Sequence, residues 1–190
     1  RLLKRSEILG EITRSQKALC VSGTHGKTTT STMIAHIFTQ SKIGASAFLG
    51  GISKNYNSNL LVNTTSPFVV VEADEYDRSF HQLSPYMAVV TATDADHLDI
   101  YNDRNNLLQS FAHFTSLIQE EGVLLAKEGI DLIPELAKNV KLYTYSSTKT
   151  ADFYAKNITT ANGKITFDFV TPTETISSIE LGVPILINVE

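Results

Sequence analysis

Residues 21–30 read VSGTHGKTTT, and this glycine-rich segment lies between an apolar run, Ala18 to Val21, and a stretch with helical spacing, Thr28 to Ser41. This order predicts a strand, a loop and a helix. A glycine-rich loop at a helix N-terminus lets backbone N–H groups approach phosphate oxygens. Lys27 adds a cation at the outer phosphates, and the hydroxyl of Thr28 is a suitable Mg²⁺ ligand. The segment therefore predicts a phosphate-binding loop.

The match to the general pattern G-x-x-x-x-G-K-[ST] is incomplete. The first glycine of that pattern falls on Val21, whereas Gly23 lies three residues before Gly26. A glycine-rich turn with an incidental surface lysine is the alternative interpretation, and the strand and helix on either side favour phosphate binding. One face of the predicted helix carries the apolar residues Met33, Ile34, Ile37 and Phe38.

Apolar runs and helical stretches alternate along the rest of the chain. Residues 68–72 and 87–91 are continuous apolar, β-branched runs, typical of strands buried on both faces of a parallel sheet. Residues 103–119 have the spacing of a long amphipathic helix. Strand, helix and strand follow, predicted over 123–126, 132–138 and 140–145. Alternating strands and helices predict an α/β fold, a mostly parallel sheet with flanking helices that contains the phosphate-binding loop.

The character of the sequence changes after residue 150. Residues 153–160 and 164–170 alternate apolar and polar side chains around Asn162-Gly163, a dipeptide that favours a tight hairpin turn. We therefore expect a smaller antiparallel β extension over 151–183.

Both ends of the chain suggest a piece of a longer protein. The first residue is Arg1 rather than Met, and the last ten residues form an apolar stretch without a terminating signal. Residues 6–14 have helical spacing, with Ser6 as the expected cap. The expected parts are a connecting helix from a missing N-terminal domain, a nucleotide-binding domain and the start of a linker to a missing C-terminal domain, over 1–16, 17–184 and 185–190.

Two acidic motifs follow predicted strands. Residues 72–77 read EADEYD, and residues 94–101 read DADHLDIY. Ligands bind beyond the carboxyl ends of strands in open α/β sheets, so we expect Glu72 or Asp74 to complete a Mg²⁺ site with Thr28. A solvated acidic loop is the alternative, because runs of charge are usually solvated.

His97 lies in the second acidic motif. Its neighbours Asp94, Asp96 and Asp99 make it a candidate to ligate a metal ion or to hold a substrate carboxylate. Its surroundings alone fit a bystander equally well, and both interpretations stay open at this point.

Composition excludes several classes of function. The 190 residues carry 16 Lys+Arg and 20 Asp+Glu, a net charge of −4 without a basic cluster, which argues against a nucleic-acid partner. The longest apolar runs fall far short of the roughly 20 residues that span a bilayer, so no membrane span is expected. The single cysteine, Cys20, excludes an internal disulfide and favours an inert buried thiol. We expect a cytoplasmic protein, although a secreted protein without disulfides fits equally.

The three motifs, in this order, resemble the central ATP-binding domain of the Mur ligases, the enzymes that build the peptide stem of peptidoglycan. The family uses the short G-T-x-G-K-T form of the phosphate loop, which accounts for Val21. EADEYD and DADHLDIY resemble the branch that joins L-alanine to UDP-N-acetylmuramate. LKRSEILGEI at 3–12 and LGVPILIN at 181–188 resemble the connections into the neighbouring domains.

The resemblance implies a role for each matching residue. Lys27 would contact the γ-phosphate of ATP, Thr28 and Glu72 would hold one Mg²⁺, and His97 would bind a second Mg²⁺ shared with the substrate carboxylate. The residues implied to cradle the ATP phosphates are Gly23, Thr24, His25, Gly26, Lys27, Thr28 and Thr29. Asn188 occupies the place of the adenine-contacting Asn, but residues 185–188 read ILIN where the family commonly has Gly-x-His-Asn.

The implied reaction transfers the γ-phosphoryl group of ATP to the lactyl carboxylate of UDP-N-acetylmuramate, and the amine of L-alanine then attacks the acyl phosphate. The missing N-terminal domain would hold the uridine end, and the missing C-terminal domain would bring the amino acid, so the chain alone is expected to bind ATP weakly and to ligate nothing. EADEYD also occurs in the related ligase that recycles murein tripeptide, which is the alternative within the family. A P-loop NTPase or nucleotide-dependent switch and a non-catalytic nucleotide-binding module are the alternatives outside it.

Overall fold

The structure is a computed structural model that describes residues 2–96, 98–182 and 189. The chain divides into two compact units, one of Arg1–Leu124 with Ile130–Lys141 and one of Leu125–Gly129 with Leu142–Glu190. The helices and strands, in chain order, are α1 (Arg5–Ser15), β1 (Lys17–Ser22), α2 (Lys27–Gln40), β2 (Ser46–Ser53), β3 (Ser58–Leu61), β4 (Phe68–Glu72), the 3-10 helix η1 (Tyr76–Gln82), β5 (Met87–Val90), α3 (Leu98–Tyr101), α4 (Arg104–Ser116), β6 (Val123–Lys127), β7 (Lys141–Ser146), β8 (Phe153–Ala161), β9 (Lys164–Val170) and β10 (Thr175–Leu181).

The first unit is built on strands in the order β5-β1-β4-β2-β3. Strand β1 pairs in parallel with β4, where Val21 lies opposite Glu72, and with β5, where Ser22 lies opposite Val90. Strand β2 is parallel to β4, and β3 is antiparallel to β2. Parallel strands present their carboxyl ends at one edge of a sheet, so the segments that follow β1, β4 and β5 lie next to one another.

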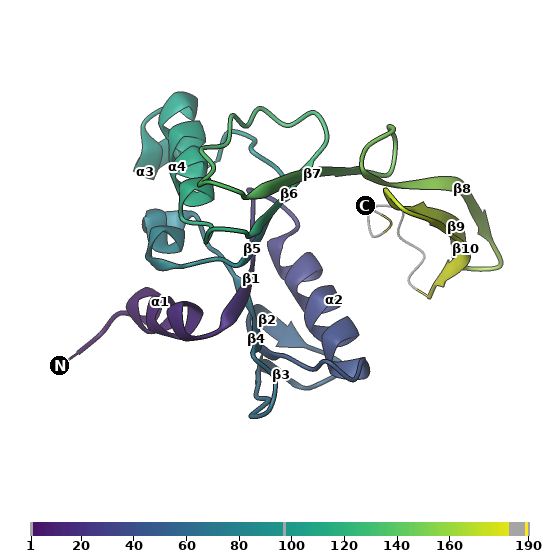
Figure 1. Ribbon diagram of the computed structural model, residues 1–190, viewed down its shortest axis with the longest axis horizontal. Helices are drawn as coiled ribbons and strands as arrows, with labels where there is room; N and C mark the ends of the chain where they lie inside the picture. Colours follow the sequence, from purple (N-terminus) through teal and green to yellow (C-terminus); the bar gives the residue numbers. More distant parts are fainter. Residues whose placement is uncertain (1, 97, 183–188, 190) are drawn as a thin grey trace. The chain divides into compact units, whose positions relative to one another are not determined.

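Helices cover both faces of this sheet, with α2 on one side and α1 and α4 on the other (Figure 1). Successive residues of β1 alternate between the two faces: Cys20 belongs to the apolar cluster that contains Phe111 and Phe114 of α4, and Leu19 belongs to the cluster that contains Ala35 of α2. In a strand that is covered on both faces, every side chain is buried, so an apolar residue is favoured at every position. This explains why β1, β4 and β5 are continuous apolar runs, and it confirms the strands predicted at these positions.

Strands β2 and β3 are not among the elements expected from the sequence. Strand β2 contains Gly50 and Gly51, which weaken the strand pattern because glycine has a low strand propensity. Strand β3 is a four-residue edge strand that reads SNLL. Its pairing with β2, rather than its own composition, defines it as a strand.

The predicted helix over 132–138 is wrong. Residues 132–137 have no regular structure and 138–139 form a turn. Pro134 explains the difference, because a proline has no N–H to donate and disfavours the helical conformation at the residue before it, Ile133.

Two details of the predicted helices are also wrong. Helix α1 begins one residue before Ser6, and Lys4 is its N-cap residue, whose backbone N–H donates to the Glu7 carboxylate at 2.7 Å. In α2, Ile37 is 64% exposed. The buried positions are Ser31 and Ala35, because small residues let α2 approach the sheet closely.

The second unit contains the C-terminal strands in the order β10-β9-β8-β7. Strands β8, β9 and β10 pair in antiparallel fashion, and β7 is parallel to β8. The β8–β9 turn is formed by Asn162 and Gly163, both with positive φ (51° and 73°), as the dipeptide predicts. The fold is thus a mostly parallel α/β sheet with an antiparallel extension, as expected. Within residues 2–96 and 98–182, no helix combines the length and apolar character that crossing a membrane requires.

Candidate functional site

The phosphate-binding loop connects β1 to α2. Gly23 and Gly26 have φ angles of 133° and 82°, which side chains other than hydrogen rarely allow. A Cβ at Gly23 would overlap the hydroxyl of Thr91 and would stand 2.8 Å from the backbone N of Ala92. The loop is also tied to the segment after β5 by the N–H of Thr24, which donates to the Ala92 carbonyl at 3.1 Å. Gly23 is therefore required by both its positive φ and the close approach of this segment, whereas Gly26 is required by its positive φ alone.

Lys27, the first residue of α2, forms a buried ion pair. Its Nζ lies 2.7 Å from Oε1 of Glu75 and 2.9 Å from the carbonyl oxygen of Gly23. The Lys27 side chain is 15% exposed and the Glu75 side chain is 0% exposed. Burial raises the pKa of the Glu75 carboxyl, and the hydrogen bond from Lys27 acts against that rise. Lys27 is thus fixed within the loop rather than extended into solvent.

Thr28 and Glu72 lie side by side at the same edge of the sheet. The Thr28 hydroxyl donates to Oε1 of Glu72 at 3.0 Å, and the backbone N–H of Gly50 donates to Oε2 at 2.9 Å. A hydroxyl on Ser31 lies 3.5 Å from Oε2. A Cβ at Gly50 would overlap the Glu72 carboxylate, so the glycine makes room for it. Three elements, α2, β2 and β4, therefore position this carboxylate.

The Thr28–Glu72 pair fits a Mg²⁺ ion. Mg²⁺ prefers oxygen ligands and is held by one or two carboxylates together with substrate phosphates and water. Within residues 2–96, 98–182 and 189, no three His, Cys, Asp or Glu side chains are grouped as ligands of one metal ion. The Thr28 hydroxyl and the Glu72 carboxylate are oxygen donors of the kind that Mg²⁺ prefers, and phosphates and water would complete the shell. Asp74, the other candidate, instead accepts from the backbone N–H of Tyr76 at 3.2 Å.

The remaining loop residues contact the start of the second acidic motif. The Thr24 hydroxyl accepts from the backbone N–H of Asp94 at 3.1 Å, and Nε2 of His25 lies 3.8 Å from Oδ2 of Asp94. The His25 carbonyl accepts from the Thr91 hydroxyl. His25 and Asp94 are both largely exposed, so this pair contributes little stability. Thr29 is exposed in the first turn of α2.

Two predicted site residues, His97 and Asn188, lie outside the described residues. Their roles as a second Mg²⁺ ligand and as an adenine contact stay predictions. The last residue of the second acidic motif, Tyr101, is fully buried. Asp103, two residues further on, caps α4 by accepting from the N–H of Asn106 at 2.8 Å.

Sequence reasoning gave no site role to Glu75, Gly50 or Ser31. Ser31 carries a usable signal, because it lies three residues after Thr28 and therefore on the same face of α2. Glu75 and Gly50 carry none, since their importance depends on contacts between elements that are far apart in the sequence. Cys20 is buried within β1, where burial raises the pKa of its thiol, as expected for an inert residue.

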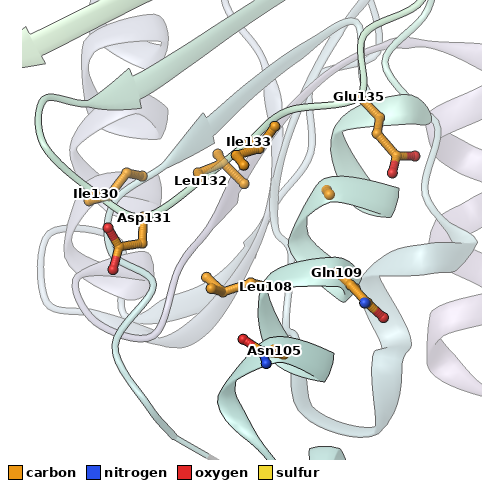
Figure 2. Close-up of a pocket in the computed structure, with 9 residues that line it drawn as sticks. Asn105, Leu108, Gln109, Ile130, Asp131, Leu132, Ile133 and Glu135 are labelled. Atoms are coloured by element: carbon orange, nitrogen blue, oxygen red, sulfur yellow. The ribbon is translucent and has the colours of Figure 1, made fainter.

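A cavity of about 710 Å³ lies elsewhere in the first unit, between α4 and residues 130–135. Figure 2 shows Leu108 on α4 and Leu132 on the opposite segment among its labelled side chains. The nine described lining residues do not include any from the phosphate-binding loop or the two acidic motifs. We therefore assign the cavity no part in the candidate site.

The loop between β1 and α2, with a lysine and a hydroxyl–carboxylate pair at the carboxyl edge of a parallel sheet, defines a P-loop nucleotide-binding α/β domain. Residues 21–190 match the Mur ligase middle domain. The chain belongs to the Mur ligase family.

Known proteins that resemble the chain support this assignment. UDP-N-acetylmuramate–L-alanine ligase of Parabacteroides distasonis is 58% identical over 189 residues, which are 100% of this chain and 41% of the relative. The chain thus spans about two-fifths of the length of that ligase.

Two solved structures share the fold. The UDP-N-acetylmuramate:L-alanyl-γ-D-glutamyl-meso-diaminopimelate ligase of Neisseria meningitides has a TM-score of 0.76 at 22% identity, over 94% of this chain and 59% of that one. The UDP-N-acetylmuramate–alanine ligase MurC of Thermotoga maritima has a TM-score of 0.75 at 23% identity, over 93% of this chain and 40% of that one.

Proposed function

We propose that the chain is the middle domain of an ATP-dependent ligase that joins L-alanine to UDP-N-acetylmuramate in peptidoglycan synthesis. The observation that carries the proposal is the placement of Lys27 beside the Thr28–Glu72 pair at the end of the phosphate-binding loop. The 58% identity with UDP-N-acetylmuramate–L-alanine ligase supports the choice of substrates. Because ATP is the co-substrate, we place the reaction in the cytoplasm.

The loop residues suit the first half of the reaction. Residues 23–29 and the N-terminus of α2 would bind the phosphates, and Lys27 would contact the γ-phosphate. Thr28 and Glu72 would hold Mg²⁺, which when bound supplies positive charge to the transferring phosphoryl group. A carboxylate oxygen of the sugar substrate attacks the γ-phosphorus, the bond from that phosphorus to the bridging oxygen of ADP breaks, and ADP leaves.

The second half of the reaction forms the amide bond. The amine of L-alanine attacks the acyl carbon, the carbon–oxygen bond to the phosphate breaks, and the amine loses a proton as inorganic phosphate leaves. Neither half uses a protein nucleophile. Positioning and charge neutralisation carry phosphoryl transfer, which matches the residue types in the site.

Four further assignments belong to this proposal. His97 binds a second Mg²⁺ together with the substrate carboxylate, and Asn188 contacts the adenine. Residues 1–16 lead from an N-terminal domain that holds the uridine end, and residues 185–190 lead into a C-terminal domain that brings the amino acid. Two observations support this organisation: residues 21–190 match the Mur ligase middle domain, and the chain spans 41% of the length of the related ligase.

The proposal is tested by ADP release from the full-length protein with ATP, Mg²⁺ and UDP-N-acetylmuramate. We expect turnover with L-alanine and none with L-Ala-γ-D-Glu-meso-diaminopimelate. Turnover with the tripeptide alone would assign the protein to the recycling ligases. Equal ADP release without sugar and acceptor would replace the ligase by an NTPase.

A further inference from the structure

We infer that Glu75 is a positioning residue, which holds the ammonium group of Lys27 in the orientation that meets the γ-phosphate. The inference rests on the proposed function. An ammonium group has three N–H donors. In the structure Lys27 directs one toward Oε1 of Glu75 at 2.7 Å and one toward the carbonyl of Gly23 at 2.9 Å. Two acceptors among the described residues orient the group, and we assign its third donor to phosphate.

Glu75 is itself held in place by the core of the first unit. Its side chain is 0% exposed, and its backbone carbonyl accepts from the Tyr101 hydroxyl at 2.5 Å and from the N–H of Arg78 at 3.0 Å. Tyr101 is fully buried, and its hydroxyl accepts from the hydroxyl of Ser110 in α4 at 3.3 Å. The backbone of Glu75 is therefore held in place by hydrogen bonds, and its carboxylate is kept away from solvent by burial.

The two glutamates of the EADE segment have separate partners. Glu72 contacts Thr28 and the N–H of Gly50, and Glu75 contacts Lys27. The Glu72 carboxylate lies beside Thr28, where the metal ion is proposed. The Glu75 carboxylate lies against the ammonium group of Lys27. One short segment that begins with the last residue of β4 thus supplies a carboxylate to Lys27 and a carboxylate to the proposed Mg²⁺ site.

Stability alone does not account for the pair. Removing two charges from water is costly, and a buried ion pair is often no more stable than two well-packed apolar side chains. A charged lysine is nevertheless required next to phosphate, and a buried carboxylate balances that charge without occupying the side of the lysine that faces the ligand.

The test is a double-mutant cycle on ATP binding by the full-length protein, with Mg²⁺ present, using Glu75→Gln, Lys27→Ala and the combination of both. Glu75→Gln keeps the shape of the side chain and removes its charge. We expect its Kd for ATP to rise about tenfold or more, as for loss of a hydrogen bond between charged groups, and its Kd for ADP, which lacks the γ-phosphate, to change much less. In the Lys27→Ala background, Glu75→Gln is expected to have no further effect.

Asp77→Asn is the matched control. It removes a carboxylate from the same segment, but Asp77 is 67% exposed and its described ion pair is with Lys4 at 3.8 Å. We expect wild-type ATP binding from this variant. Tyr101→Phe is the second test if Glu75→Gln does not fold: it keeps both charges and removes the hydroxyl that fixes Glu75. It should weaken ATP binding and leave ADP binding unchanged.

Three results would overturn the inference. Tighter ATP binding by Glu75→Gln would show that Glu75 competes with phosphate for Lys27. Additive losses in the double variant, or equal losses for ATP and ADP together with a lower melting temperature, would show a structural role only. Failure of the proposed function is detected separately. A wild-type protein that binds ATP but forms no ADP with sugar and L-alanine would refute the proposed ligase activity, whereas the double-mutant cycle on ATP binding would still decide the role of Glu75.

Discussion

Gly50→Ala tests whether the position of the Glu72 carboxylate controls phosphoryl transfer. A Cβ at Gly50 would stand 2.5 Å from Cδ of Glu72, whereas carbon atoms in van der Waals contact are about 3.5–4.0 Å apart. The carboxylate must therefore move by roughly 1 Å. The 3.0 Å contact between Thr28 and Glu72 does not survive a shift of that size away from Thr28.

Misplacement by about 1 Å reduces catalysis by roughly 100-fold, so we expect a fall of that order in kcat for the full-length Gly50→Ala protein. Gly51→Ala is the matched control, because a Cβ there would lie 3.5 Å from Cγ2 of Thr28, an ordinary contact. The assay is ADP release with sugar and L-alanine at increasing Mg²⁺. We expect Gly50→Ala to need more Mg²⁺ and Gly51→Ala to behave as wild type. Wild-type turnover and Mg²⁺ dependence in Gly50→Ala would refute the reasoning.

Three further predictions concern the site and the second unit. Thr28→Val keeps the shape of an exposed side chain but removes its hydroxyl. The Mg²⁺ concentration for half-maximal ADP release should rise while the melting temperature stays unchanged. An unchanged Mg²⁺ requirement would contradict the assignment of Thr28 as a Mg²⁺ ligand. The backbone N–H of Ser178 and the amide of Asn157 donate hydrogen bonds to the Asp168 carboxylate and lower its pKa. The stability that these bonds contribute is present above the ordinary Asp pKa and is lost as pH falls through the lowered value. Asp168→Asn should therefore reduce the dependence of the free energy of unfolding on pH in the acid range. Gly163→Ala introduces a Cβ at φ 73° and should lower the free energy of unfolding of the hairpin by about 1 kcal/mol, measured by denaturant titration; an unchanged value would show that the turn tolerates the strain.

The sequence predicts those parts of the fold in which local chemistry and tertiary structure agree. Gly23 and Gly26 mark the phosphate-binding loop because their positive φ angles disfavour other residues, and close backbone approach adds to this at Gly23. Asn162 and Gly163 mark the hairpin because both have positive φ angles. The buried strands are recognised because covering both faces removes the alternation of polar residues.

Strand β3 was missed because it depends on its pairing with β2, which no local pattern encodes. The helix predicted over 132–138 is wrong for a local reason, because Pro134 disfavours the helical conformation at the residue before it. The candidate site divides in the same way. Lys27, Thr28 and Glu72 follow from motif and strand order, whereas a buried role for Glu75 cannot be read from a segment of acidic residues that resembles a solvated loop.

Oxygen-isotope transfer tests whether the γ-phosphoryl group of ATP passes to the carboxylate of the sugar substrate. UDP-N-acetylmuramate labelled with ¹⁸O in both oxygens of the lactyl carboxylate is incubated with the full-length protein, ATP, Mg²⁺ and L-alanine, and the released phosphate is analysed by mass spectrometry. One labelled oxygen leaves with phosphate when the amine attacks the acyl phosphate, and the other stays in the amide. We predict one ¹⁸O in each released phosphate. Unlabelled phosphate would mean that water attacks ATP, and it would exclude the acyl phosphate.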